Sequence, residues 1–233
     1  MLEQGIYDKP HLRQVTEGIL YRLRVGCPWR DVPSEFGSWN AIYKRFCYWS
    51  SKGKLMKVFQ ALVIEPDLEW SCIDSSSVRA HQHSAGARGD EDQGIGQSRG
   101  GRTTKIHLGV DAYGLPLNFE LTGGQVHDCK AAPTLLDKLP AADALLADKG
   151  YDSQALRERL ALQASKPIIP KKKNSKQPGN DSFDWGTYVY RHLVENAFAR
   201  LKQFRALATR YDKLKRNFQG TVALACIIIW LPM

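Results

Sequence analysis

The sequence lacks the features of an exported, membrane-spanning or zinc-stabilised protein. Its five cysteines form no CxxC pair and have no histidine at zinc-finger spacing, so we expect reduced thiols in a cytoplasmic protein. The opening "MLEQGIYDKPHLRQ" contains no apolar stretch of the kind found in secretory signal peptides. The closing "TVALACIIIWLPM" is apolar but too short to span a bilayer, which requires about 20 residues. We expect a buried closing helix there and no membrane partner.

The charge is unevenly distributed along the chain. The sequence has 33 Lys and Arg against 24 Asp and Glu, a net charge of +9. Residues 1–66 carry a net +4, residues 67–169 a net −3 and residues 170–233 a net +8. An acidic middle between basic flanks suits a site that gathers carboxylates while its surroundings bind a polyanion such as DNA. The alternative interpretation is ordinary surface solubility, which gives the same total.

The first third of the chain has the periodicity of short helices. Apolar residues recur at helical spacing in residues 10–25, and further helices are expected at 38–50 and 53–64. A segment with two prolines and two glycines separates the first two of these helices. Three short helices with basic residues among aromatic ones predict a small helical, helix-turn-helix-like DNA-binding domain over residues 1–66. We expect Trp29, Trp39 and Trp49 to lie in its core rather than to stack on bases.

The remainder, residues 67–233, is predicted as an α/β catalytic domain. The expected order is a strand ending at Asp74, a mobile Gly-rich loop, a hairpin, and then helix, strand, helix, strand and helix. The loop is expected at 82–102 and the hairpin at 103–123. The helices are expected at 127–139, 153–163 and 187–202, and the strands between them at 142–150 and 166–170. This order is that of the ribonuclease-H-like fold, a mixed sheet with three antiparallel strands followed by parallel strands reached through helices.

Three acidic residues lie where this fold would bring them together. Asp74 ends the first strand and Asp148 the fourth, and these strands are neighbours about 5 Å apart. Glu195 would come from the helix packed over that end of the sheet. Carboxylates so close repel one another unless a cation joins them, and hard divalent cations prefer oxygen ligands. The alternative for each aspartate alone is a helix cap or a turn residue.

The helix containing Glu195 carries further polar residues on one arc. On a regular helix Tyr188, Arg191, Glu195 and Lys202 fall within about 60°. Beside them lies an apolar arc formed by Leu193, Val194, Ala197, Phe198, Leu201 and Phe204. The alternative is an exposed row of ion pairs within the helix. If DNA passes this edge, Arg191 can grip phosphate bidentately, Lys202 can act as a point charge, and Tyr188 can stack on a base.

Other residues are predicted to contact DNA on weaker grounds. Lys149 and Tyr151 adjoin Asp148 and could touch phosphate. The run formed by Lys171, Lys172, Lys173 and Lys176 is expected to contact phosphate, with a solvated loop as the alternative. His81, His107 and His127 are interpreted as hydrogen-bonded structural residues, with contact to DNA or the site as the alternative.

Several stretches resemble bacterial insertion-sequence transposases of the DDE type, in the insertion-sequence-five family. These include "GILYRLRVGCPWRDVPSEFGSWNAIYKRFCYW", "CIDSSSVRAHQ", "LLADKGYDS" and "YVYRHLVENAFARLKQFRALATRYDKL". The spacing Tyr-x2-Arg-x3-Glu-x6-Lys of the wider superfamily is met by Tyr188, Arg191, Glu195 and Lys202. The resemblance covers nearly the whole chain from about residue 11. Relatives usually carry a further N-terminal segment, and its absence here would affect recognition of the element's ends.

The resemblance implies that Asp74, Asp148 and Glu195 are the catalytic, metal-binding triad. It implies two Mg²⁺ ions, replaceable by Mn²⁺, that support cleavage at the element's ends and joining of the 3′ hydroxyls to target DNA. The expected partners are double-stranded DNA at the terminal inverted repeats and at the target, with a homodimer or larger oligomer on DNA in the bacterial nucleoid. Two alternatives are a DNA-binding regulator without cutting activity and a nuclease that cuts without joining.

Overall fold

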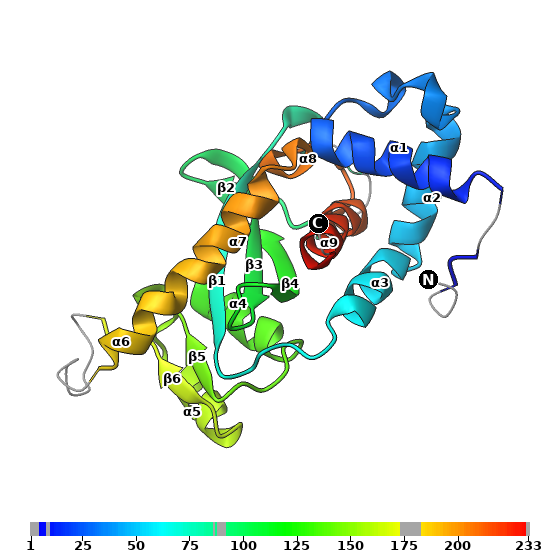
Figure 1. Ribbon diagram of the computed structural model, residues 1–233. Helices are drawn as coiled ribbons and strands as arrows, with labels where there is room; N and C mark the ends of the chain where they lie inside the picture. The colour runs from blue at the N-terminus through cyan, green and yellow to red at the C-terminus, as the bar shows by residue number, and fades with distance from the viewer. Residues whose placement is uncertain (1–4, 8–9, 86, 88–91, 173–182, 232–233) are drawn as a thin grey trace.

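The computed structural model describes residues 5–7, 10–85, 87, 92–172 and 183–231 (Figure 1). Its α-helices include the three predicted near the N-terminus and the predicted closing helix. They are α1 (Leu12–Val25), α2 (Trp39–Ser51), α3 (Lys54–Leu62), α4 (Asp128–Leu136), α5 (Gln154–Leu162), α6 (Trp185–Tyr188), α7 (His192–Lys202), α8 (Arg205–Ala208) and α9 (Lys215–Trp230). Short 3₁₀ segments are η2 (Trp29–Asp31), η3 (Ser34–Phe36), η4 (Gln82–Ala85), η5 (Lys149–Tyr151) and η6 (Val189–Arg191).

The described strands form one mixed sheet. They are β1 (Ser71–Ala80), β2 (Gly96–Ser98), β3 (Gly101–Val110), β4 (Pro116–Gly123), β5 (Ala144–Leu146), β6 (Lys166–Ile168) and β7 (Thr209–Arg210). β3 is antiparallel to β1, β2 and β4, whereas β5 and β7 run parallel to β1 and β6 runs parallel to β5. The order β4-β3-β1-β5-β6, antiparallel first and then parallel, is the predicted ribonuclease-H-like arrangement.

Two predictions about the first strand and the loop after it were wrong. β1 does not end at Asp74 but continues to Ala80, because it pairs with β3 from Cys72 to Arg79 and buries Val78 and Ala80. The polar run after Asp74 is therefore compatible with a strand whose neighbour supplies its hydrogen bonds. The predicted loop over residues 82–102 contains η4 and β2 among its described residues, and β2 pairs with the start of β3, where Gly101 has φ 92°. Residues 86 and 88–91 of that loop lie outside the described residues, and its mobility stays a prediction.

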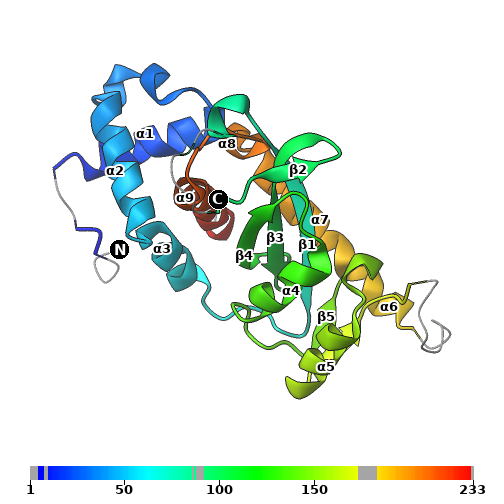
Figure 2. The same cartoon turned by 180° about the vertical axis from the view of Figure 1, so that it is seen from behind.

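Helices cover both faces of the sheet. Figures 1 and 2 show α7 on one face and α4 on the opposite one. Alternating residues of β1 divide between two apolar cores: Cys72 and Val78 pack with α7 and α9, while Ile73 packs with α4 and α5. Asp74 has the same parity as Cys72 and faces α7, whereas Ser75 has the parity of Ile73 and faces α4.

The closing helix α9 lies between the N-terminal helices and the sheet (Figure 1). It contacts α2, α3 and β4, and the larger apolar core runs through all of them. Trp49 is buried in this core and Trp29 packs against it, as predicted. The prediction for Trp39 was wrong, because this first residue of α2 is 36% exposed beside Arg30. The domain boundary at residue 66 stays a prediction. In the described part of the chain, every helix is too short or too polar to cross a bilayer.

Candidate active site

The site lies where the sheet opens along one edge of β1. On that edge β5 pairs only with Ser71 and Cys72, and β7 pairs with Arg79 and Ala80. Between these two pairings, β1 has no strand partner on that side among the residues that the structure describes. The middle of β1 therefore has a free edge at this gap within the described residues. The helix α7 packs over one face of the sheet there and contacts β1 and β3.

The register brings the two predicted aspartates to the same point of this gap. The last pair between the parallel strands joins Cys72 to Leu146. Two residues further along each chain come Asp74 and Asp148, so both acids follow directly from the end of the β1–β5 ladder. Neighbouring strands lie about 4.8 Å apart, which makes the two carboxylates neighbours.

Asp148 is held by the turn that follows β5. It caps the 3₁₀ segment η5, and its Oδ1 accepts a hydrogen bond of 2.8 Å from the Gly150 backbone N–H. The side chain is half-buried. The turn and site interpretations of this residue are thus compatible, because the cap uses one oxygen and leaves Oδ2 available.

Arg191 joins Asp74 to Glu195. Its Nη1 lies 3.2 Å from Asp74 Oδ2, and its Nη2 forms an ion pair with Glu195 Oε1 one helical turn away. The side chains of Arg191 and Asp74 are 22% and 21% exposed, whereas that of Glu195 is 51% exposed. One guanidinium therefore gathers carboxylates from a strand and from the helix above it.

The environment of Asp74 disfavours its negative charge. Burial raises the pKa of Asp74, and the negative charges of Asp148 and Glu195 raise it further. The Ser75 backbone N–H, which donates to Asp74 Oδ1 at 2.7 Å, and the Arg191 guanidinium lower this pKa, but the net shift is upward. The same balance shows that Asp148 and Glu195 both act electrostatically on Asp74.

The helix that carries Glu195 is less regular than predicted. Residues 185–202 form α6, then the 3₁₀ segment η6, and then α7, because the chain tightens where the His192 ring Nδ1 donates to the Val189 carbonyl at 2.8 Å. Val194, Ala197, Phe198, Leu201 and Phe204 are buried as predicted, while Leu193 is half-buried.

Tyr188 and Lys202 lie at opposite ends of this segment. The ring of Tyr188 is half-buried, with its centroid 5.9 Å from the Arg191 guanidinium carbon. Lys202 ends α7 and is exposed. Seven residues at 1.5 Å each place it about 10 Å along the helix from Glu195. The side chains predicted to share one arc of the helix are therefore spread along its length.

The donor set suits a hard divalent cation. Asp74, Asp148 and Glu195 offer only carboxylate oxygens, the ligands that Mg²⁺ prefers. Asp74 and Glu195 already share the positive charge of Arg191. Within the described ranges, no three His, Cys, Asp or Glu side chains form a ready-made metal-binding group.

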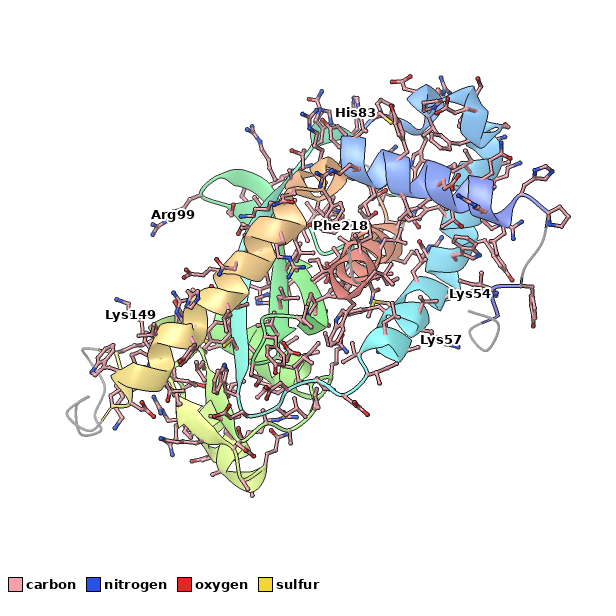
Figure 3. All side chains as sticks on the ribbon, viewed as in Figure 1. Lys54, Lys57, His83, Arg99, Lys149 and Phe218 are labelled. Carbon is pink, nitrogen blue, oxygen red and sulfur yellow. The ribbon has the colours of Figure 1, made fainter. Side chains whose placement is uncertain are left out.

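Of the other predicted phosphate contacts, Lys149 is exposed in η5, and its side chain points outward on the side of α6 and α7 (Figure 3). Tyr151 cannot touch phosphate, because it is fully buried against α4 and α5. Lys172 uses its Nζ to donate to the Asp152 carbonyl at 3.1 Å. Lys171 is half-buried. Lys173 and Lys176 lie outside the described residues.

The histidines behave largely as structural residues. His107 is fully buried, with Nε2 2.9 Å from Thr122 Oγ1, and burial lowers its pKa to about 4. His127 precedes α4 and is exposed. His81 stacks on Tyr211 with ring centroids 4.6 Å apart, away from the carboxylates.

Sequence reasoning missed a fourth acid near the site. Asp128 opens α4, and its Oδ1 accepts hydrogen bonds from Ser75 Oγ at 2.7 Å and from Lys105 Nζ at 3.1 Å. Ser75 follows Asp74 on β1, so this network holds the strand from the opposite face of the sheet. An acidic residue in the first turn of a helix was the only available signal.

This sheet order, with acids at the edge between β1 and β5, defines a ribonuclease-H-like protein. The family described as "Transposase DDE domain" matches residues 65–230, and "Putative transposase of IS4/5 family" matches residues 2–59. The chain belongs to the transposase DDE domain family. It is a DNA transposase of the insertion-sequence type, a metal-dependent polynucleotidyl transferase.

Individual relatives carry the same description. The chain is 40% identical over 131 residues to the "Putative transposase for insertion sequence element IS6501" of Brucella ovis, covering 55% of this chain and 98% of that protein. It is 30% identical to the "Transposase for insertion sequence element IS1106" of Neisseria meningitidis serogroup B, covering 53% of this chain and 44% of that one. Among solved structures, the "Mos1 transposase paired-end complex with left transposon end" aligns at 11% identity and a TM-score of 0.29, covering 88% of this chain and 82% of that one.

Proposed function

We propose that this transposase cleaves DNA at the ends of its insertion sequence and joins the freed 3′ hydroxyls to target DNA. The observation that carries the proposal is the meeting of Asp74, Asp148 and Glu195 at the gap in the sheet, with Arg191 between two of them. Each of these carboxylates has a structural partner, but three of them beside an open edge repel one another, and a bound cation would relieve that repulsion.

Asp74, Asp148 and Glu195 would hold two Mg²⁺ ions, with Mn²⁺ as a substitute. When bound, such ions stabilise negative charge on the attacking and leaving oxygens of a phosphodiester. The backbone N–H groups of Ser75 and Gly150 orient Asp74 and Asp148 by donating to one oxygen of each. Among the described residues this leaves Oδ2 of Asp148 for the cation, whereas Oδ2 of Asp74 is held by Arg191 Nη1 at 3.2 Å and would exchange that contact for the cation.

Arg191, Tyr188 and Lys202 are proposed to position the DNA strand. Arg191 carries five N–H donors and so retains donors beyond those engaged with the two carboxylates. The exposed Lys202 would add a phosphate contact about 10 Å further along the helix, as Lys149 would beside Asp148. The basic run 171–173 and the helical region 1–66 are proposed to extend this grip and to recognise the element's inverted repeats.

The proposed partners are double-stranded DNA at the element's ends and at the target, and a second copy of this chain on that DNA. Phosphate neutralisation by exposed Lys and Arg accounts for the net charge of +9. We expect the enzyme to act in the bacterial cytoplasm, at the nucleoid.

The test uses DNA that carries the element's own flanking sequence, a target plasmid and Mg²⁺, with the ends and joined products mapped. We expect cleavage and joining by the wild type, loss of both in Asp148→Ala, and retention in Asp143→Ala. Asp143 is a matched control because it is exposed and lies five residues before Asp148. Cut ends without joined products would identify a nuclease, and binding without cutting would identify a DNA-binding regulator.

A further inference from the structure

A cavity of about 800 Å³ lies between the N-terminal helices and the catalytic sheet, away from the carboxylates. It is bounded by the end of α1 and the segment after it, by Tyr43 of α2, by residues 81–83 after β1, and by residues 211–217, which run from the end of β7 into α9. His83, which lines the cavity, lies beside the C-terminal end of α1 (Figure 3). Neither the proposed metal site nor the phosphate contacts use these residues.

The cavity has aromatic walls on two sides. On the side of the N-terminal helices, the Trp29 and Tyr43 rings lie 5.4 Å apart, with the Arg22 guanidinium 4.8 Å from the Trp29 centroid. On the side of the sheet, His81 and Tyr211 stack with an interplanar angle of 26°, and Tyr211 is 46% exposed. Flat rings with exposed surface are the usual platform for stacking a planar heterocycle.

Two residues that line the cavity, Arg22 and Asn217, each carry a buried polar atom that has no hydrogen-bond partner within the described ranges. These atoms are Arg22 Nε, a donor, and Asn217 Oδ1, an acceptor, and each residue is only 5% exposed. The Arg22 guanidinium is otherwise engaged with Asp212 Oδ2 at 3.9 Å. A buried donor or acceptor without a partner is unfavourable, so a ligand that offers the complementary atoms is stabilised when the Arg22 or Asn217 side chain turns toward it. The edge of a nucleobase offers both kinds of atom.

The wall on the sheet side is preformed. Arg210 is fully buried and donates to the carbonyls of Asp212 at 2.9 Å and Lys213 at 3.3 Å, and to Thr104 Oγ1 at 2.7 Å. The segment that carries Tyr211 is therefore fixed to β3. Binding here would cost little loop ordering.

An exposed cation lines the cavity. Lys213 lies between Asp212 and Leu214, which also line it, and its side chain is exposed. It can contact a phosphate next to a base that enters the cavity. A free apolar ligand would not require this charge.

We propose that this cavity receives a single nucleobase unstacked from the bound DNA. The inference rests on the proposed function for its DNA substrate. Six residues of β1 separate Asp74 from Ala80, a length of about 20 Å, which corresponds to roughly six base pairs of DNA. The base bound here therefore belongs to DNA several steps from the cleaved bond and contributes to recognition of the site.

The test uses two duplexes of one sequence, one with a single unpaired 2-aminopurine and the other with that base paired. Stacking on the aromatic walls should quench 2-aminopurine fluorescence, and the wild type should bind the unpaired duplex about five- to a hundredfold more tightly. Tyr211→Ala should lose most of this preference and Tyr211→Trp should retain it. Tyr113→Ala is the matched control, because Tyr113 is 72% exposed on the β3–β4 turn and outside the cavity.

Equal affinity for the two duplexes without quenching would overturn the proposal, as would an equal loss in Tyr113→Ala. Free adenosine monophosphate is the second probe, and binding of it in place of DNA would also overturn the proposal. An Asp74→Asn protein should bind the unpaired duplex and quench its fluorescence without cleaving DNA. The outcomes with wild type separate this inference from the proposed function. Quenching with no cleavage by wild type refutes only the function, and cleavage by wild type with no quenching refutes only the cavity.

Discussion

The environment of Asp74 predicts that removing its charge will abolish cleavage without weakening the fold. Because the folded-state pKa of Asp74 is raised, mainly by burial, folding favours its protonated form over its ionised form relative to the unfolded chain. Its contribution to stability is therefore present at low pH and is lost as the pH rises through that raised pKa. At pH 7 the ionised carboxylate costs folding free energy, even after the attraction of Arg191 is included.

Asp74→Asn keeps the shape and removes the charge. We expect the free energy of unfolding at pH 7 to be unchanged or higher by up to about 1 kcal/mol, as is common when functional residues are neutralised. For a chain of this size 1 kcal/mol corresponds to about 2–4 °C in Tm. The assay is thermal unfolding in EDTA, paired with Mg²⁺-dependent cleavage of element-end DNA, which should be lost.

Asp212→Asn provides the contrast, because Asp212 is a buried carboxylate with structural partners. It accepts from Thr221 Oγ1 at 3.1 Å and lies 3.9 Å from Arg22, with both charged side chains about 5% exposed. Breaking such a pair costs about 3 kcal/mol or more, so Tm should fall by roughly 6–12 °C. If Asp74→Asn were destabilised as much as Asp212→Asn, Asp74 would be a structural residue and the reasoning would fail.

Three further predictions follow from the charges and the burial of individual groups. Binding to duplex DNA should weaken with salt at a log–log slope of about −5 or steeper, and neutralising residues 171–173 together should flatten that slope without changing sequence preference. A slope near zero would show that the net positive charge serves solubility and not DNA binding. Lys202→Ala should lower the cleavage rate about ten- to a hundredfold while Mn²⁺ affinity, measured by calorimetry, is kept. Glu195→Gln should lose Mn²⁺ affinity. Equal losses of Mn²⁺ affinity in both variants would refute the assignment of Glu195 to metal binding and of Lys202 to DNA positioning. His107 has a lowered pKa of about 4, so its contribution to stability is complete above its ordinary pKa of 6.5 and is lost as the pH falls from there toward 4. Urea unfolding at pH 7.5 and 5 should show a smaller decrease for His107→Gln than for wild type, and identical decreases would contradict the burial argument.

Much of the fold follows from local patterns in the sequence. The helices at 12–25, 39–51 and 54–62 and the hairpin around residue 111 lie close to their predicted positions, because their periodicity and turn residues are local properties. At that turn Asp111 Oδ1 accepts from the Tyr113 and Leu115 N–H groups, and Gly114 takes φ 78°, as a tight reversal requires. The spacing of Tyr188, Arg191, Glu195 and Lys202 could also be recognised in the sequence, and it supported the resemblance to the transposase family.

Pairing between distant segments could not be predicted in the same way. β7 is two residues long and joins β1 only because the chain returns there after α8, so no local pattern marks it. The extension of β1 beyond Asp74 depends on hydrogen bonds from β3, and polar Ser75–Ser77 gave no sign of it. A strand end was therefore predicted at a residue that lies inside a strand.

The sequence by itself determined which residues can act: the acids, the basic flanks and the helix that carries Glu195, because residue type and spacing are written in the chain. Only the tertiary structure decided how they meet. It set Asp74 beside Asp148 through the β1–β5 register, and it drew Arg191 across to Asp74, 117 positions away in the chain. It also built the cavity between Trp29 and Tyr211 from four separate parts of the described chain. These contacts depend on the packing of α7 and α9 against the sheet, and packing over such distances leaves no periodic trace in the sequence.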